Sequence, residues 1–215
     1  MSVATVGLVA VLLVGWLLWG TSLFGVGQIR VTGAEIVTAE QVREAAAVPV
    51  RTPLLRLRTG EVAARVAQLP AVAAVEVSRQ WPDTVVIQVR ERTPVAAVPT
   101  EDGFLLLDAD AVAFHQVPTA PAELPVVVLG QPGPSDPATQ AALRVLASLT
   151  PQLAEELVSL TVAGPANIRL ELFSGWTVVW GDDSESDVKA QVATALLDRE
   201  GEIMDVSAPR VVSVR

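Results

Sequence analysis

The chain has 215 residues and a formal net charge of −9, with no cysteine and a single histidine. The absence of cysteine excludes disulfides and thiolate metal sites, and one histidine excludes a three-histidine zinc centre within one chain. The acidic balance argues against nucleic acid as a partner and against a polybasic grip on anionic lipid, because both of these partners are negatively charged.

Residues 3–24 form a long apolar stretch without a charged side chain. About 22 residues of helix rise roughly 33 Å, which is enough to cross a ~30 Å hydrocarbon core. Trp16 and Trp19 lie one turn apart near the far end, where aromatic residues favour the membrane interface. A cleaved signal peptide is the alternative, but no Lys or Arg precedes the stretch and its length exceeds that of a signal. The pattern predicts an uncleaved transmembrane anchor within residues 1–24.

A first folded block is expected over residues 25–93. It starts with an extended run at residues 28–32. A capping box follows, in which the Thr38 side chain accepts a hydrogen bond from the Gln41 backbone and the Gln41 side chain reaches back. Thr59 is a plausible N-cap for a second helix.

Two strands complete this block, at residues 71–79 and 84–91, where apolar and polar residues alternate with the period of a strand. The sequence Trp81-Pro82-Asp83 between them predicts a turn. Two helices packed on one face of a small sheet would make an α+β unit, ordered strand, helix, helix, strand, strand.

A second block over residues 94–215 is expected to be a mostly antiparallel β-domain with two helices. Its strands are predicted at residues 95–98, 104–107, 112–114, 124–129, 157–162, 168–173, 176–180, 203–206 and 210–214. Asp136 followed by a proline predicts the first helix, with Leu143, Leu146 and Ala147 facing inward. Ser184 is expected to cap the second helix. Its predicted inner stripe consists of Val188, Val192, Ala195 and Leu196.

Taken together, the anchor and the sequences QIRVTGAEIVTAEQV and VAAVEVSRQWPDTVVIQVRERTPVA resemble the POTRA domain of the FtsQ/DivIB division proteins. The positions that carry this resemblance are Val77, Arg79, Trp81, Pro82, Thr84, Val85, Ile87, Val89, Glu91, Arg92 and Pro94. The C-terminal part is also similar to the family at Gly181-Asp182, Lys189, Leu196-Leu197, Ile203, Asp205-Val206-Ser207 and Pro209. The chain departs from the family's Val/Leu-Asp-x-x-Gly hairpin, because Ala111 stands where glycine is usual.

The resemblance implies a bitopic membrane protein with a cytoplasmic N-terminus, whose C-terminal domains lie outside the cytoplasm at the division septum. Proteins of this family are scaffolds rather than enzymes and need no cofactor or small-molecule substrate. They link early and late division proteins and bind FtsB-like and FtsL-like bitopic partners upstream of septal peptidoglycan synthesis. The POTRA domain is implicated in recruitment, and the C-terminal edge of the β-domain takes a partner strand.

The terminal strand at residues 210–214 is short and β-branched, and no later segment follows to cover it. An exposed strand edge carries unpaired N–H and C=O groups that suit β-augmentation. The alternative is an interior strand that contributes only packing, and the resemblance favours the edge. The predicted partner-binding residues are Asp205, Val206, Ser207, Arg210, Val211 and Val212. Arg79 and Trp81 are either a POTRA contact site or a stacked structural pair.

Three other groups of residues have side chains that suit a functional site, but each also has an ordinary structural interpretation. His115 with Asp108 and Asp110 has the composition of a general base with its orienting carboxylate, but a solvated hairpin residue is the preferred interpretation. The acidic residues Asp182, Asp183, Glu185 and Asp187 have cation-binding chemistry, yet carboxylates are ordinary at the start of a helix. Trp176 and Trp180, with Phe173 nearby, are interpreted as a core aromatic cluster rather than a ligand platform.

Two alternative functions remain open from the sequence. One is another POTRA-bearing protein, such as a secretion or outer-membrane assembly factor. The other is a membrane-tethered cell-wall hydrolase, against which the single histidine, the absence of cysteine and the absence of a nucleophile elbow all count.

Overall fold

The computed structural model describes Gly7 and residues 25–214, and the chain divides into two compact units, Met1–Arg92 and Thr93–Arg215. The anchor predicted over residues 3–24 therefore lies, except for Gly7, outside the described residues. Among the residues that are described, no helix has the length and apolar character needed to cross a bilayer.

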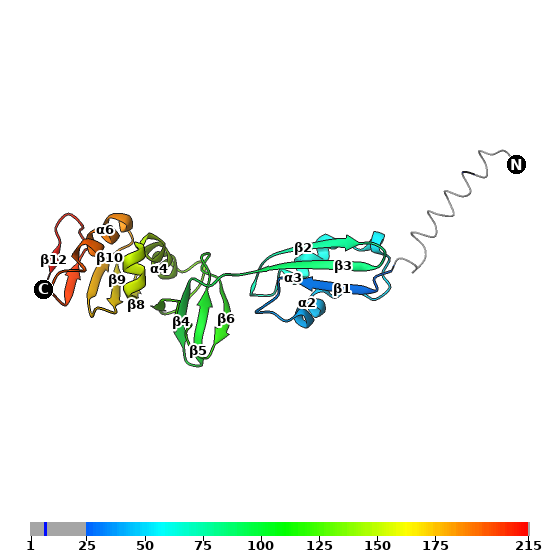
Figure 1. The fold of residues 1–215 in the computed structure, drawn as a ribbon, viewed down its shortest axis with the longest axis horizontal. Helices are drawn as coiled ribbons and strands as arrows, with labels where there is room; N and C mark the ends of the chain where they lie inside the picture. The colour runs from blue at the N-terminus through cyan, green and yellow to red at the C-terminus, as the bar shows by residue number, and fades with distance from the viewer. Residues whose placement is uncertain (1–6, 8–24, 215) are drawn as a thin grey trace. The chain divides into compact units, whose positions relative to one another are not determined.

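Over residues 25–92 the first unit is a three-stranded sheet with two α-helices (Figure 1). Its elements are β1 (Gln28–Thr32), α2 (Ala39–Ala46), the 3-10 turn η2 (Leu54–Arg56), α3 (Thr59–Val66), β2 (Val72–Gln80) and β3 (Thr84–Glu91). Strand β3 is central, parallel to β1 and antiparallel to β2. The predicted order of strands and helices is confirmed.

The two helices of this unit begin differently. Thr38 caps α2 as predicted, since its hydroxyl accepts from Gln41 N at 3.2 Å while Gln41 Oε1 accepts from Thr38 N at 2.8 Å. The cap predicted at Thr59 is wrong, because Thr59 is already helical and the N-cap is Arg58, which makes no capping bond with its side chain. Glu61 in the first turn supplies the negative charge that a helix N-terminus favours.

Polar tethers tie the loops of the first unit to its small core. The Glu91 carboxylate accepts from three successive backbone N–H groups between β1 and α2, at 2.8–3.1 Å. Arg65 donates twice to Ala46 O at the end of α2, at 2.6 and 3.0 Å. Such charge-assisted bonds to backbone are stronger than neutral ones, so they help to fix the segments between the strands and helices.

The second unit is built on a nine-stranded sheet in the order β12-β11-β10-β9-β8-β7-β4-β5-β6. Its strands are β4 (Ala96–Thr100), β5 (Gly103–Leu107), β6 (Ala113–Val117), β7 (Val126–Val128), β8 (Leu157–Gly164), β9 (Asn167–Leu172), β10 (Thr177–Gly181), β11 (Ile203–Asp205) and β12 (Ser213–Val214). Antiparallel pairs predominate, with parallel pairing at β4–β7, β7–β8 and β10–β11. The expected mostly antiparallel α+β domain is confirmed.

Three helices accompany this sheet, namely α4 (Pro137–Ser148), α5 (Pro151–Glu156) and α6 (Ser186–Leu196). The short helix α5 was not predicted. The sequence that starts this helix is local. Thr150 accepts from Leu153 N at 3.2 Å as the N-cap, and a proline occupies the first helical position.

Helix α4 begins as predicted but buries a different face. Asp136 accepts from Thr139 N at 2.7 Å and from Thr139 Oγ1 at 2.6 Å, and these bonds lower the pKa of the Asp136 carboxyl. The buried residues are Thr139, Ala141, Ala142 and Val145. The predicted inward face of Leu143, Leu146 and Ala147 is therefore wrong: Leu143 and Leu146 are only partly buried and Ala147 is exposed. The small side chains on the buried face let this helix approach the sheet closely. This close packing decides which face is buried, although the leucines have more apolar surface.

Helix α6 differs from the prediction in its start and in its buried face. Ser184 does not cap it, because the Ser184 hydroxyl donates to Asp182 at 2.6 Å and the helix begins at Ser186. The predicted stripe of Val188, Val192, Ala195 and Leu196 is not the buried face, and Val188 is 46 % exposed. The buried residues are Ser186, Lys189, Ala190 and Ala193.

The core of the second unit contains the two tryptophans near the end of the sheet. Trp180 is fully buried and Trp176 nearly so, which confirms that they are core residues. Phe173 does not join them, because it is 75 % exposed beyond the end of β9. Trp180 Nε1 donates to Ser186 Oγ at 3.2 Å, so its polar atom is satisfied within the core.

Candidate partner-binding edge

Strand β12 lies at one end of the nine-stranded sheet. It pairs antiparallel with β11, with Met204 opposite Val214 and Asp205 opposite Ser213, and no described strand lies on its other side. It has two residues, whereas the sequence predicted a strand over 210–214. The reason is a turn, in which Val211 N donates to Ala208 O at 2.8 Å and bends the chain before it reaches the sheet. The position is an edge, not the interior of the sheet.

Strand β11 supports this edge through a buried apolar layer and two backbone bonds. Met204 and Val206 are fully buried, and β11 runs parallel to β10. Thr177 N donates to Glu202 O at 2.9 Å, and Val206 N donates to Val179 O at 3.0 Å. The edge therefore rests on a strand that is bonded to β10 and packed into the core.

The loop that follows β11 is fixed by its own side chains. Asp205 Oδ1 accepts from Ser207 N at 3.0 Å and from Ser207 Oγ at 2.6 Å. Gly181 makes room for this loop, because its φ is +80° and a Cβ there would lie 2.8 Å from Ser207 Cβ. A glycine is needed at this close approach.

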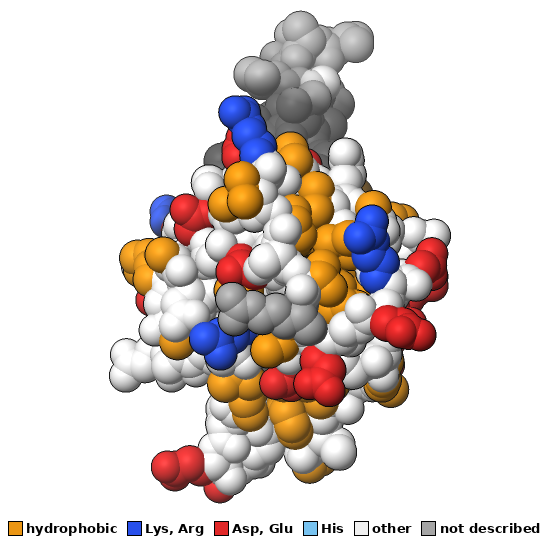
Figure 2. All heavy atoms as spheres, turned by 90° about the vertical axis from the view of Figure 1, so that its left-hand side faces the viewer, with side chains coloured by type: hydrophobic (Ala, Val, Ile, Leu, Met, Phe, Trp, Pro, Cys, Tyr) orange, Lys and Arg blue, Asp and Glu red, His pale blue; other side chains and the backbone are white. Residues whose placement is uncertain are grey.

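The six predicted contact residues belong to this one segment but differ in exposure. Val206 is buried, while Val212 is partly buried against the core. Arg210 is exposed and Val211 is 80 % exposed, so these two side chains are available at the surface. Figure 2 looks onto the end of the molecule that carries β12 and shows apolar side chains among isolated acidic and basic ones.

The acidic loop before α6 is held by cations of the chain itself. Lys189, with a side chain only 1 % exposed, donates to Asp182 O at 2.9 Å and to Asp182 Oδ1 at 2.8 Å. The hydrogen bond from Lys189 is the main cause that lowers the pKa of Asp182 to about 2. Arg144 on α4 forms an ion pair with Asp183. Among the described residues no group of His, Cys, Asp or Glu is arranged to hold a metal ion.

A shallow hollow of about 390 Å³ lies beside the loop after β11. It is lined by Glu185 at the start of α6 and by Ala208, Pro209 and Arg210. The sequence analysis missed the contribution of Glu185. The only available signal was the pair of opposite charges, Glu185 and Arg210, whose proximity depends on how β11 returns beside β10.

Arg79 and Trp81 lie in the other unit. Arg79 donates to Leu57 O at 2.7 Å, so its guanidinium tethers the end of β2 to the loop that contains η2. Trp81 is 49 % exposed in the turn between β2 and β3. The structure thus gives Arg79 a structural bond and leaves a large part of Trp81 available for contact.

Asp108 lies in the turn between β5 and β6, and His115 lies on β6. Asp108 is buried, and its Oδ1 accepts from Asp110 N at 3.0 Å and from Val112 N at 2.8 Å. Ala111, at the position where glycine was expected, adopts a φ of +63°. These bonds use Oδ1 of the Asp108 carboxylate within the turn.

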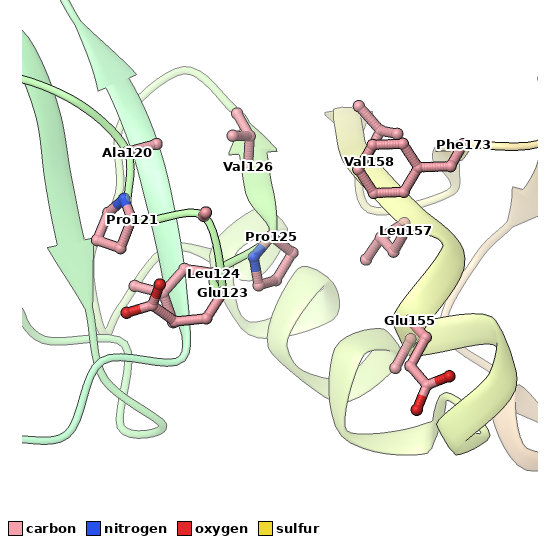
Figure 3. Close-up of a pocket in the computed structure, with 12 residues that line it drawn as sticks. Ala120, Pro121, Glu123, Leu124, Pro125, Val126, Glu155, Leu157, Val158 and Phe173 are labelled. Atoms are coloured by element: carbon pink, nitrogen blue, oxygen red, sulfur yellow. The ribbon is translucent and has the colours of Figure 1, made fainter.

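A larger hollow of about 490 Å³ opens elsewhere on the second unit, beside β7 and β8 (Figure 3). Figure 3 shows Val158 and Phe173 on one side and the segment from Ala120 to Pro125 on the other. The walls are mostly apolar, with the carboxylates of Glu123 and Glu155 among the lining groups. The sequence analysis did not identify this surface.

Comparison with known proteins decides the family. Residues 24–92 match the family model of the POTRA domain, FtsQ-type, and residues 96–213 match that of the Cell division protein FtsQ/DivIB, C-terminal. The chain belongs to the FtsQ/DivIB family of cell division proteins. The first unit is accordingly called the POTRA unit below, and the second the β unit.

Curated relatives agree with this assignment. The chain is 40 % identical over 201 residues to the cell division protein FtsQ of Mycobacterium leprae, covering 94 % of this chain and 59 % of that protein. It is 39 % identical over 211 residues to FtsQ of Streptomyces bingchenggensis, covering 94 % and 80 %. The chain spans about 59–64 % of the length of the mycobacterial relatives. FtsQ/DivIB proteins act in cell division.

A solved structure shows a weaker likeness. The major extracytoplasmic domain of the trans isomer of DivIB from Geobacillus stearothermophilus is 19 % identical, with a TM-score of 0.39. The match covers 50 % of this chain and 94 % of that one. At this level the likeness supports no further conclusion.

Proposed function

We propose that this chain is a bitopic, non-enzymatic scaffold of the divisome. In this proposal residues 1–24 anchor it in the cell membrane with the N-terminus in the cytoplasm. The POTRA domain (residues 25–93) and the β-domain (residues 94–215) act outside the cytoplasm at the septum. Support comes from the family matches and from the uncharged apolar stretch at residues 3–24.

The scaffold binds FtsB-like and FtsL-like bitopic proteins and through them supports septal peptidoglycan synthesis. The observation that carries this proposal is the position of β12 at the end of the sheet. A partner segment adds as a further strand beside Ser213–Val214 and contacts the exposed residues Arg210 and Val211, while Asp205 and Val206 support the edge from inside the sheet. Main-chain bonds supply affinity in this mode, and side chains such as Arg210 and Val211 supply specificity.

The other functional classes have less support. A secretion or outer-membrane assembly factor shares a POTRA domain, but the match over residues 96–213 is to the C-terminal domain of FtsQ/DivIB proteins. For a cell-wall hydrolase, the Asp108 carboxylate near the single histidine accepts two backbone hydrogen bonds within its own turn. A scaffold therefore fits the observations better than either alternative.

The test is a binding titration with the full chain in lipid nanodiscs. The ligand is the extracytoplasmic segment of an FtsB-like protein from the same organism. Neighbouring residues of a strand direct their N–H groups to opposite sides, so Ser213→Pro and Val214→Pro form a matched pair. Proline has no backbone N–H group. One of the two substitutions therefore removes an N–H that points away from the sheet, and the other removes an N–H that points toward β11.

The proposal predicts saturable binding by the unaltered chain and its loss in the proline variant that removes the outward donor, with an unchanged circular dichroism spectrum. A Glu76→Ala variant, at an exposed residue of β2, serves as a control in the other unit. Full binding by both proline variants would contradict the edge mechanism and direct attention to the POTRA unit.

A further inference from the structure

We propose that one end of the POTRA unit lies on the surface of the membrane and contacts anionic lipid headgroups. The contact surface, called the basal patch, consists of Val50, Arg51, Leu55, Arg56 and Trp81. This inference rests on the proposed anchor at residues 3–24, and it assigns a lipid contact to folded residues that follow the anchor.

The basal patch exposes three large apolar side chains. Val50 is 80 % exposed, and Leu55 and Trp81 are each 49 % exposed. In contrast, Leu54 is fully buried and Leu57 nearly so, which means that the loop is anchored by its other leucines. Trp favours the boundary between headgroups and acyl chains, where its ring is apolar and its N–H stays hydrated.

The patch is fastened directly to the residues that follow the anchor. Val26 N donates to Thr52 O at 2.9 Å, and Arg51 N donates to Val26 O at 3.0 Å. Gly25 pairs with Pro53 in an antiparallel bridge. The chain is therefore already part of the folded unit at Gly25, one residue after the apolar stretch ends.

The turn between β2 and β3 joins the same end of the unit. Gly27 N donates to Asp83 O at 2.8 Å, and the bond from Arg79 to Leu57 O ties β2 to the loop of η2. Figure 1 shows the start of β1 and the β2–β3 turn at one end of the POTRA unit. In the proposed arrangement the described fold begins at Gly25, directly after the anchor at residues 3–24, and this keeps the same end of the unit close to the bilayer.

The charges of the patch suit an anionic surface. Among the described residues, the side chains of Arg51 and Arg56 have no ion pair or hydrogen bond, whereas the neighbouring Arg58 pairs with Glu61 at 2.7 Å. Asp83, in the turn that contains Trp81, accepts from Thr84 Oγ1 at 3.2 Å. The guanidinium groups of Arg51 and Arg56, together with exposed apolar side chains, match the combination that binds lipid interfaces.

The two units differ in charge, and the net charge of the whole chain does not show this difference. Residues 25–92 carry nine arginines against seven carboxylates, whereas residues 93–215 carry six basic and seventeen acidic side chains. The expectation that an acidic chain avoids anionic lipid therefore applies to the β unit. The POTRA unit is weakly basic, and electrostatic attraction to lipid acts over short distances on the groups that lie near the surface.

The absence of cysteine makes the test direct, because one introduced thiol can be labelled alone. Val50→Cys places an environment-sensitive fluorophore in the patch. Gln68→Cys places the same fluorophore on an exposed residue before the start of β2, which is the opposite end of the strand from Trp81. The full chain is reconstituted in phosphatidylcholine vesicles with or without phosphatidylglycerol, and shallow nitroxide lipids serve as quenchers.

The proposal predicts a blue-shifted fluorophore at position 50 that is quenched several-fold more strongly than the one at position 68. Quenching at position 50 increases with phosphatidylglycerol, and the double variant Arg51→Gln/Arg56→Gln removes that increase. Equal, weak quenching at both positions in vesicles that carry the protein would overturn the basal patch and leave the anchor proposal standing. Failure of the protein to float with the vesicles would overturn both.

Discussion

The two units of this chain stabilise and expose their sheets in different ways. In the POTRA unit the central strand β3 is paired with a strand on each side. Charged side chains such as Glu91 and Arg65 form hydrogen bonds with backbone atoms of the connecting segments. In the β unit a large apolar core supports nine strands, and the last of them has two residues and an open side. Both sheets end in edge strands, β1 and β2 in the first unit and β6 and β12 in the second, so the units differ in how their loops and cores are held and not in having an edge.

The largest expected effect comes from the β-unit core. Trp180→Ala removes a fully buried ring and should cost about 3–5 kcal/mol of unfolding free energy, as large-to-small core substitutions do. Hydrogen exchange should show lost protection within residues 93–214 and unchanged protection in residues 25–92. Loss of protection in both units would contradict their description as separately packed bodies. Phe173→Ala, at a residue that is 75 % exposed, is the matched control with little expected effect.

Glu91→Ala should destabilise the POTRA unit by about 2–3 kcal/mol, because three backbone N–H groups lose a charged acceptor. Denaturant unfolding monitored by exchange at residues 35–37 measures the change. Glu76, an exposed carboxylate on β2, provides the control as Glu76→Ala. Equal stability of the two variants would show that the tether contributes nothing beyond an ordinary surface residue.

The contact between Lys189 and Asp182 should make the β unit sensitive to acid. The pKa of Asp182 is lowered to about 2 in the folded state, whereas an unfolded Asp titrates near pH 3.9. Its stabilising contribution is therefore present above about pH 4 and is lost as the pH falls towards 2. Lys189→Met should flatten the stability profile in that window. An unchanged acid dependence of β-unit unfolding in this variant would refute the assignment.

The smallest expected effect on stability belongs to the edge itself. Val211→Ser changes a side chain that is 80 % exposed, so the unfolding free energy should stay within about 0.5 kcal/mol. Binding of the FtsB-like segment should nevertheless weaken, which a titration of the full chain in nanodiscs measures. Reduced stability together with unchanged binding would assign Val211 to the fold and not to the contact.

The same contrast explains which features the sequence could predict. The capping box of Thr38 and Gln41 and the alternation along β3 are local signals, and both appear in the structure as expected. Strands β1 and β3 have the predicted bounds. In the POTRA unit short-range pattern and final packing agree, with the cap at Thr59 as the exception.

In the β unit the features that failed depend on distant parts of the chain. Helix α6 buries Lys189 because the Asp182 carbonyl and carboxylate satisfy its ammonium, and no periodicity of apolar residues contains that information. Strand β12 is short because of a turn at Ala208–Val211. The edge position was predicted from the end of the sequence, but its extent and the hollow beside Glu185 depend on the return of β11 alongside β10.

The most direct test of the scaffold proposal is backbone amide exchange in the full chain, in nanodiscs, with and without the FtsB-like segment. The proposal predicts slower exchange at Ser213–Val214 and in the neighbouring loop, with no change at Trp81 or in the hollow of Figure 3. Saturable binding that slows exchange at either of those other surfaces and leaves Ser213–Val214 unchanged would contradict it.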